Sequence, residues 1–522
     1  MQLGAHLPAL RKVPGMHVDV RPVSRLRGSD GVNVMALLAP VVDTLCADSI
    51  DLSRVSVVCD WIQYRANFRE VADFRPVLAA PWPPAAGQDA SGYDATDAAG
   101  HQPDEAALEI ALDLRRCADV DISAVISELL AEHANPAASS KVPLEPWVTG
   151  AHSCIWQFNA LYWQALSLWE QATGREYEQA LPGGESDARN VAAARELILE
   201  LFKVWDDLDA RGALPGELYV LELGVGNGNQ ARTWLDEFAA LSAVHGRDYY
   251  RRLQYLMGDY SPHVLGRAFK AVAHHAEHVN ALVVDATHPA VSLGFLRGKA
   301  FLAYVSNVYD NLPSDELIRI GGRTYQVDVR AYLRGADVDH IAAGLHAPAE
   351  RLPDIVTKLL RLGPELLCEA MPQHFDGVAQ AVTFWREVWA ALRLQERYVP
   401  LEALDLYRVS PDMTGELLRS QLESVGDVRI HVNNGALSSF AQTLPLLHPF
   451  GRLQCHDLFL TDVRHYRTGF YGPGKYDGSV VNWINGPLLH RVGSRSGFDV
   501  RIAPFAQRPS ANIKTLTAQV RE

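Results

Sequence analysis

The sequence of 522 residues contains few cysteines and no long apolar run. Its six cysteines are scattered without a Cys-x-x-Cys pair, which favours buried thiols in a reducing compartment over a disulfide framework or a zinc site. Because no stretch reaches about 18 consecutive apolar residues, we expect no membrane-spanning segment. A formal net charge of −14 argues against broad binding to nucleic-acid backbones. These absences favour an ordinary soluble globular protein.

The N-terminus is basic: before residue 28 it has five Lys and Arg residues and one acidic residue, Asp19. This composition is similar to that of a transit peptide, but Pro8, Pro14 and Pro22 interrupt an amphipathic helix there. We therefore expect a cytoplasmic protein.

A glycine-rich loop directly follows a short apolar run. Residues Leu218–Leu223 form a mainly apolar run with β-branched and aromatic side chains, which predicts a buried parallel strand. An amphipathic segment follows the loop. The chain turns between them at Gly224, Gly226 and Gly228. A strand, a glycine loop and a helix form a nucleotide-binding crevice, because glycine permits a sharp turn and the helix N-terminus offers free N–H groups. A turn without a ligand is the alternative.

Two kinds of cofactor suit such a loop. The dinucleotide pattern G-x-G-x-x-G requires a glycine at position 229, where this chain has Asn229. Instead, Glu222 precedes a G-x-G-x-G run. This pattern resembles motif I of class I S-adenosylmethionine methyltransferases. The resemblance implies that Glu222 and the three glycines surround the methionine and ribose parts of S-adenosyl-L-methionine.

Three further strands are predicted at Leu253–Gly258, Ala281–Val284 and Phe301–Ser306. The first ends at Asp259, where a doubly wound fold expects an acidic residue to bind the ribose hydroxyls. Asp285 follows the second strand, and related methyltransferases place an acidic residue there, near the adenine amine. Acidic residues after successive parallel strands predict an α/β, doubly wound, Rossmann-like methyltransferase fold.

Residues 256–265 and 301–313 resemble the MidA family more closely. Asp259-Tyr260-Ser261-Pro262 matches the family's acidic-x-Ser-Pro element, and Asn307, Asp310 and Pro313 match its Asn-Glu-x-x-Asp-x-x-Pro element. The family implies a protein arginine side chain as methyl acceptor. Asn307 is also a candidate cofactor-binding residue. Val308 replaces the family's glutamate, so another protein residue or a small-molecule nitrogen or oxygen nucleophile remains an alternative acceptor.

Methyl transfer from a sulfonium is an in-line displacement, so a base is needed only when the nucleophile must lose a proton. The candidate catalytic residues at the carboxyl edge of the sheet are Asp310, His456, Asp457 and Tyr471. Asp310 is favoured because it also matches the family motif. For His456 a hydrogen-bonded core histidine is the competing interpretation. His274, His275 and His278 have no nearby carboxylate pattern, so we interpret them as a solvated helix face and expect no metal.

The remaining chain predicts the domain organisation. Residues 1–145 form an N-terminal module of unknown role with a loop or linker at 80–105 and helical patterning at Glu105–Glu132. We expect a helical lead-in at 146–213, the two parts of the methyltransferase domain at 214–313 and 441–522, and a helical and hairpin insertion, or lid, at 314–440. Further expectations are an aromatic core helix Ile155–Thr173, a long helix capped by Ser186, a hairpin at Gly321-Gly322, a helix Ala379–Leu394, a fifth strand Arg452–Leu460, a flexible loop Gly469–Gly478 and last strands Val480–Ile484 and Phe498–Ile502.

Two other functional classes stay open. One is a non-catalytic assembly or binding protein that keeps the fold, and the other is a nicotinamide-dependent oxidoreductase, which Asn229 disfavours. Cofactor binding separates the three hypotheses. The oligomeric state is not predicted.

Overall fold

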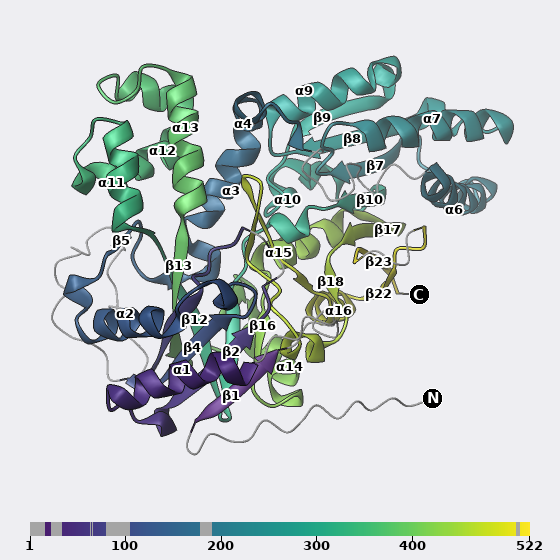
Figure 1. Ribbon diagram of the computed structural model, residues 1–522. Coiled ribbons are helices and arrows are strands. Elements are labelled where there is room, and N and C mark those ends of the chain that lie inside the picture. The colour runs from purple at the N-terminus through teal and green to yellow at the C-terminus, as the bar shows by residue number, and fades with distance from the viewer. Residues whose placement is uncertain are drawn as a thin grey trace.

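A seven-stranded and a ten-stranded sheet organise the chain (Figure 1). The computed structural model describes residues 16–21, 34–62, 64, 66–79, 105–177, 191–507 and 512–521. Within these ranges, every helix is too short or too polar to cross a membrane.

The seven-stranded sheet has the order β22-β23-β17-β10-β7-β8-β9. Its strands are β7 (Leu218–Leu223), β8 (Leu253–Asp259), β9 (Val279–Val283), β10 (Ala300–Ser306), β17 (Leu447–Asp457), β22 (Phe498–Pro504) and β23 (Lys514–Val520). Strands β9, β8, β7, β10 and β17 are parallel, and β23 is antiparallel to both its neighbours. In chain order the parallel strands run 3-2-1-4-5, as in a doubly wound sheet, so the order reverses between β7 and β10. This confirms the predicted fold class at the level of the sheet.

Helices cover both faces of this sheet. Leu218 and Val220 of β7 belong to one apolar cluster, whereas Leu221 and Leu223 belong to another, because successive side chains of a strand point to opposite faces. The first cluster contains α6 (Val191–Ala210), α7 (Asn229–Val244), α8 (Tyr249–Arg252) and α9 (Pro262–Ala271). The second contains α10 (Pro289–Leu293), α15 (Asn434–Thr443) and α16 (Gly486–Arg495).

The ten-stranded sheet joins two distant parts of the sequence. Its order is β1-β2-β4-β3-β13-β12-β11-β16, and β5 and β6 also pair with β12. The strands are β1 (His17–Arg21), β2 (Val55–Asp60), β3 (Ala72–Leu78), β4 (Glu105–Asp113), β5 (Lys141–Pro143), β6 (Val148–Thr149), β11 (Glu316–Ile320), β12 (Arg323–Arg334), β13 (Arg393–Pro400) and β16 (Val428–His431). Val77 of β3 lies opposite Tyr398 of β13, so the predicted N-terminal module and the predicted insertion share one sheet.

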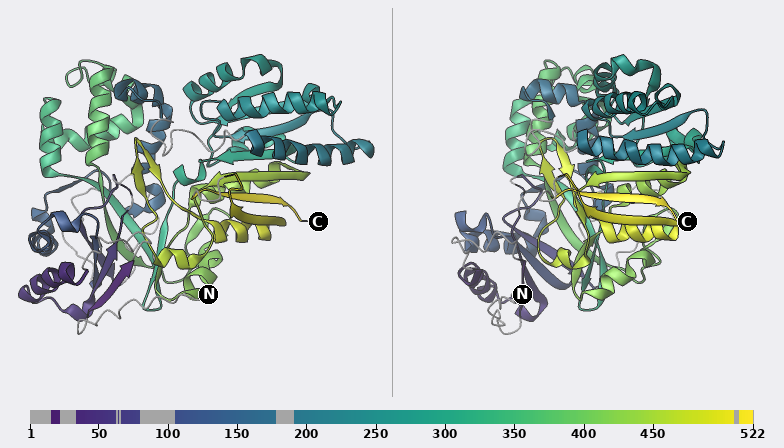
Figure 2. Two further views of the ribbon diagram at one scale, coloured as in Figure 1. Left: turned by 45° about the vertical axis from the view of Figure 1, so that its right-hand side comes forward. Right: turned by 90° about the vertical axis from the view of Figure 1, so that its right-hand side faces the viewer.

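Helices pack on this second sheet in two groups. Next to β1–β4 lie α1 (Val34–Ala47) and α2 (Ile122–Ala134). A second apolar cluster holds α3 (Ile155–Gln164), α4 (Leu166–Thr173), α11 (Gly335–Gly344), α12 (Leu352–Ala370) and α13 (Val378–Ala391), and Figure 2 shows the last three helices, in green, beside α3 and α4, in blue. Trp156, Tyr162 and Trp169 are buried in this cluster, which confirms that the aromatic stripe is core packing.

Smaller elements complete the fold. Three two-stranded ribbons pair β14 (Arg408–Ser410) with β15 (Met413–Thr414), β18 (Phe459–Leu460) with β21 (Ile484–Asn485), and β19 (Gly474–Tyr476) with β20 (Ser479–Val481). Helix α14 spans Arg419–Ser424, and short 3-10 helices include η8 (Ala273–His278) and η10 (Tyr309–Asn311). The hairpin predicted at Gly321-Gly322 joins β11 and β12, which is confirmed.

The helical prediction for Glu105–Glu132 is wrong in its first half. Residues Glu105–Asp113 form β4, and α2 begins only at Ile122. Strand β4 pairs with both β2 and β3, so it is buried on both edges, and its nearly continuous apolar run fits a central strand as well as a helix. The predicted helix Ile155–Thr173 is two helices that meet at Ala165.

The prediction for the C-terminal third also needs correction. Segment Gly469–Gly478, predicted as a flexible loop, contains β19, and Val480–Ile484 contributes to small ribbons instead of the seven-stranded sheet. The sheet instead ends in β22 and β23, of which β23 was not predicted. Strand β13 of the other sheet was not predicted either, because its first residues were assigned to a helix that ends at Leu394. The fifth strand begins at Leu447, earlier than expected. Ser186 and the loop at 80–104 lie outside the described residues.

Candidate functional site

The loop after β7 has the conformation that glycine provides. Gly224 and Gly226 have φ angles of +74° and +57°, in the left-handed region that other residues rarely adopt. A Cβ atom at Gly226 would also lie 2.5 Å from the hydroxyl of Tyr177, and one at Gly224 would collide with Val308. Gly228 is the N-cap residue of α7. These glycines are thus required by packing as well as by any ligand, so their presence alone does not separate a cofactor loop from a structural turn.

Asp259 turns its carboxylate toward this loop. It is the last residue of β8, and its Oδ2 accepts a hydrogen bond from the N–H of Gly226 at 3.3 Å. Its Oδ1 accepts one from the N–H of Ser261 at 3.0 Å. Desolvation raises the pKa of Asp259 to about 6. The structure therefore puts a carboxylate with spare acceptor capacity beside the glycine loop, where the sequence predicted a ribose-binding group.

Glu222 and Asp285 have different surroundings. The Glu222 carboxylate is buried on the α7 face of the sheet and accepts a hydrogen bond from the hydroxyl of Tyr255 at 2.7 Å. Burial raises the pKa of Glu222 to about 8, so this side chain is mostly neutral at pH 7. Asp285 lies exposed after β9, and its Oδ1 accepts hydrogen bonds from the N–H and Oγ1 of Thr287 at 2.8 and 2.6 Å. Asp285 thus also forms a local turn.

The loop after β10 touches the glycine loop. Asn307 has a positive φ of +52°, and its N–H donates to the carbonyl of His456 at 2.9 Å. Val308 packs its side chain against Gly224. At the position where the MidA family has a glutamate, this chain therefore makes an apolar contact. The contact joins the loops after β7 and β10, between which the strand order reverses.

Asp310 and Asp457 come together behind this contact. Asp457 Oδ2 accepts hydrogen bonds from the N–H groups of Tyr309 and Asp310 at 2.9 and 3.3 Å. Asn311 donates to Asp310 Oδ1 at 2.7 Å. Burial raises the pKa of Asp310 to about 6, and burial together with the nearby charge of Asp310 holds the pKa of Asp457 well above its usual range. Asp457 fixes the turn that carries Asp310.

His456 points away from these carboxylates, because neighbouring residues of a strand face opposite sides. Its Nδ1 lies 2.9 Å from the hydroxyl of Thr515 and its Nε2 lies 3.1 Å from the amide nitrogen of Gln454. Burial lowers the pKa of His456 to about 4, so the ring is neutral at pH 7. These contacts favour the core-histidine interpretation. Tyr471, the fourth candidate, has its hydroxyl 3.2 Å from Thr468 Oγ1.

Two residues that the sequence did not single out stand near the crevice. Gln164 donates to the hydroxyl of Tyr260 at 2.8 Å, and Tyr177 lies against Gly226. Helix α4 is also attached to α9 by Arg267 and Glu170, 2.8 Å apart. The helical lead-in therefore covers this part of the sheet edge. Its residues are too far from the motifs in sequence for any local pattern to reveal them.

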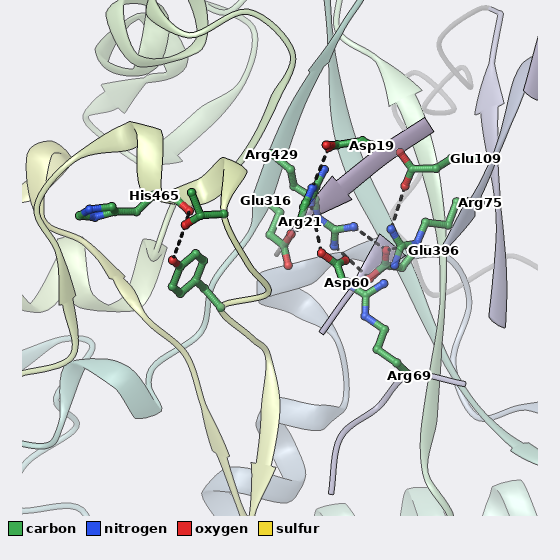
Figure 3. Close-up of polar contacts among 12 residues, drawn as sticks. Asp19, Arg21, Asp60, Arg69, Arg75, Glu109, Glu316, Glu396, Arg429 and His465 are labelled. Atoms are coloured by element: carbon green, nitrogen blue, oxygen red, sulfur yellow. Dashed lines mark hydrogen bonds and ion pairs between the residues drawn. The ribbon is translucent and has the colours of Figure 1, made fainter. Parts of the chain in front are cut away.

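A second polar cluster, away from the crevice, links the N-terminal strands to the insertion (Figure 3). Glu396 of β13 lies 2.6 Å from Arg69, 3.0 Å from Arg75 and 2.7 Å from Arg429. Burial alone would raise the pKa of Glu396, but these three guanidinium groups hold it well below its usual range. Every one of these side chains is nearly fully buried. Because the charges are paired, we interpret the cluster as structural.

A cavity of about 430 Å³ lies elsewhere, between α4, the end of α13 and β19. Its volume suits a small ligand, and its walls include Trp169, Trp389, Arg386, Arg393 and Lys475. The cavity contains none of the predicted cofactor or catalytic residues. It therefore gives no support to the predicted site.

No protein-family model matches the sequence, and no match was found among curated proteins. The comparison with solved structures gives partial matches, of which three are described. A Burkholderia thailandensis protein bound to S-adenosylhomocysteine is 14% identical, with 76% of this chain and 92% of that chain covered and a TM-score of 0.42. The 1,6-didemethyltoxoflavin-N1-methyltransferase of the same organism is 10% identical (73% and 95% covered, TM-score 0.30). The CcbJ methyltransferase of Streptomyces caelestis is 11% identical (70% and 99% covered, TM-score 0.30). At such values these likenesses do not establish an activity for this chain.

Proposed function

We propose that this protein is an S-adenosylmethionine-dependent methyltransferase whose cofactor binds between the loops that follow β7 and β10. The observation that carries the proposal is the position of Asp259 beside a glycine loop at the point where the parallel sheet reverses its order. Ligands of doubly wound sheets bind in the crevice outside the carboxyl ends of the strands at such a reversal.

The residues present fit this cofactor. The backbone of Gly224–Gly228 would hold its methionine and ribose parts, and Asp259 would accept hydrogen bonds from the ribose hydroxyls. Asp285 and Asn307 stand at the same edge for the adenine and the neighbouring groups. Glu222 would act indirectly, through the strand that carries the loop, because its own carboxylate is bonded to Tyr255. The cofactor supplies a methyl group already activated on a sulfonium.

Asp310 is the residue that we assign to the methyl acceptor. A buried carboxylate can orient a donor group of the acceptor and, when ionised, can take up the proton that the nucleophile loses. Val308 contributes an apolar side chain that packs against Gly224, where the MidA family has a glutamate. The family resemblance implies an arginine side chain, but the valine supplies no charge to bind a guanidinium. The acceptor class therefore extends to small-molecule nitrogen and oxygen nucleophiles.

The test is a calorimetric titration of the purified protein with S-adenosylhomocysteine, with NADH as the control ligand. We expect saturable binding of S-adenosylhomocysteine alone. Binding of NADH alone would instead support the oxidoreductase hypothesis. A folded protein that binds neither ligand would support the non-catalytic assembly hypothesis.

Asp259→Ala should weaken S-adenosylhomocysteine binding by about 1.5–3 kcal/mol, because hydrogen bonds to a charged acceptor are lost. Asp259→Asn keeps one oxygen acceptor and should lose less. Asp339→Ala, at an exposed position of α11, is the matched control and should bind like the native protein. Equal affinities for all four proteins would remove Asp259 from the cofactor site.

A further inference from the structure

Two histidines and a carboxylate converge on the outer side of the seven-stranded sheet, apart from the crevice. Asp236 of α7 places its Oδ1 2.9 Å from Nε2 of His274 and 3.0 Å from Nε2 of His275. The three atoms lie within 4.8 Å of one another. The sequence pattern favours the interpretation of these histidines as a solvated helix face without a carboxylate. That interpretation is wrong in two respects, since His275 is buried and α7 supplies the carboxylate from 38 residues earlier.

The donor set matches the preferences of a divalent transition metal. Zinc binds imidazole nitrogen and carboxylate oxygen at about 2.0–2.2 Å, so neighbouring ligands of a tetrahedral ion stand about 3.4 Å apart. Each nitrogen needs to move away from the Asp236 oxygen by only about 0.5 Å to reach this spacing, and the two nitrogens lie within 4.8 Å of each other. The side chains of Asp236 and His274 are 51% and 54% exposed, which leaves them room to move. Water can fill the fourth position.

Tyr250 holds His275 in an orientation that suits a metal ligand. The Tyr250 hydroxyl lies 2.5 Å from Nδ1 of His275, and either atom can be the donor. For Nε2 to bind a metal, the proton of a neutral imidazole must sit on Nδ1. The Tyr250 oxygen can then accept the hydrogen bond from Nδ1, as the outer partners of metal-bound histidines usually do.

We propose that Asp236, His274 and His275 form a binding site for Zn²⁺ or a similar divalent transition-metal ion. The ion connects α7, which follows the glycine loop, to η8, which precedes the edge strand β9. Its role is to brace these two elements against each other. This inference is independent of the proposed methyl transfer, since none of the three residues contacts the crevice residues through a hydrogen bond or ion pair in the described part of the chain.

The test is a titration of the metal-free protein, without a histidine tag, with ZnCl₂ at neutral pH. We expect one saturable site in the native protein and a rise in melting temperature with added zinc, because a ligand that binds only the folded state stabilises it. His274→Ala and Asp236→Asn, both at half-exposed positions, should lose this site and the rise. His263→Ala removes an exposed histidine outside the cluster and should behave like the native protein. MgCl₂ should not replace zinc, because magnesium prefers oxygen ligands.

The Tyr250→Phe variant distinguishes a metal site at Asp236, His274 and His275 from a cluster that is held only by hydrogen bonds. It keeps the aromatic ring but removes the oxygen that orients His275, and should weaken zinc binding about 10- to 100-fold. The proposal is overturned if the native protein has no saturable zinc site, or if His274→Ala and Asp236→Asn bind zinc as tightly as the native protein. Melting of each variant without zinc verifies that it is folded.

Discussion

At the scale of single residues, Asp310 and Asp457 flank the same backbone turn, and burial disfavours a charge on both. The pKa of Asp310 is raised to about 6 and that of Asp457 further above its usual range. Each carboxylate disfavours ionisation of the other, so the two titrate as a pair. Asp310, with a pKa of about 6, is mostly ionised at pH 7, which suits the acceptance of a proton.

We predict that Asp310→Asn lowers turnover by about 10²–10⁴-fold if the nucleophile loses its proton in the reaction. S-adenosylhomocysteine affinity should remain nearly unchanged. In the native enzyme the rate should fall as the pH drops through about 6, since Asp310 then becomes protonated and no longer accepts a proton. A quenched assay of methyl transfer to an identified acceptor, run over a range of pH, measures the loss of turnover and its pH dependence. A loss of cofactor affinity in the variant would move Asp310 into the cofactor site.

The predicted residues near the crevice lie at the end of a strand or in the turn after it. Asp259 and Asp310 could be predicted because each stands in a local pattern of a strand, a turn and a helix. Tyr177 and Gln164 could not, because tertiary packing brings them to the loop from another part of the chain. For the same reason the sequence missed the carboxylate of Asp236 beside the histidines.

At the scale of elements, the ribbon of β19 and β20 is fixed by a buried lysine. The ammonium group of Lys475 donates to the carbonyls of Trp389, Ala390 and Leu392 at 2.6, 3.1 and 2.7 Å. These carbonyls lie at the end of α13, where a helix leaves its last acceptors without partners. A cation there also interacts favourably with the helix dipole. Lys475 thus joins the C-terminal third of the chain to the insertion.

We predict that Lys475→Met destabilises the protein by about 1–3 kcal/mol, because the carbonyl of Trp389 loses its hydrogen-bond partner while the apolar stem is retained. Urea unfolding followed by circular dichroism measures the change. Lys270→Met, at an exposed position near the end of α9, is the control and should alter stability by less than about 0.5 kcal/mol. Equal effects of the two substitutions would show that Lys475 does not hold the ribbon.

Elements with one strong local signal could be predicted, and those decided by their partners could not. Strand β7 has the predicted bounds because its apolar run allows a single assignment. Strand β4 was mistaken for a helix because its burial depends on β2 and β3. The segment with β19 looked flexible because Gly469–Gly478 is rich in glycine, but Lys475 and Asp477 bind it to distant parts of the chain.

At the scale of the whole molecule, the N-terminal strands are integrated into the fold through the buried charges around Glu396. Arg75 comes from β3, Glu396 from β13 and Arg429 from β16, so one charge network crosses most of the ten-stranded sheet (Figure 3). Removal of the Glu396 charge would leave the buried Arg69 without the carboxylate that it pairs with. Arg75 would keep Glu109, and Arg429 would keep Glu316. Strand β3 is therefore energetically coupled to β13 and β16.

We predict that Glu396→Gln destabilises the protein by about 3–5 kcal/mol at pH 7, the usual cost of breaking a buried ion pair. The folded-state pKa of Glu396 is depressed, so its contribution is present above the ordinary value of 4.5 and is lost as the pH falls below it. The difference between native and variant stability should therefore shrink at acid pH, as measured by chemical unfolding. Glu416→Gln breaks an exposed pair with Arg419 and should alter stability far less, because solvent screens this pair. Similar costs for both substitutions would contradict the coupling.

The interleaving of the two sheets has a consequence for how the chain is made. Strand β10 ends at Ser306, but its partner β17 begins only at Leu447. In the same way, β3 ends at Leu78, and its partner β13 begins only at Arg393. A ribosome that adds about 5–20 residues per second needs of the order of ten seconds or more to deliver either missing partner. During synthesis both growing sheets therefore expose an open apolar edge at the same time. The nascent chain is accordingly a natural client for chaperones that shield unpaired strands until the last third has emerged.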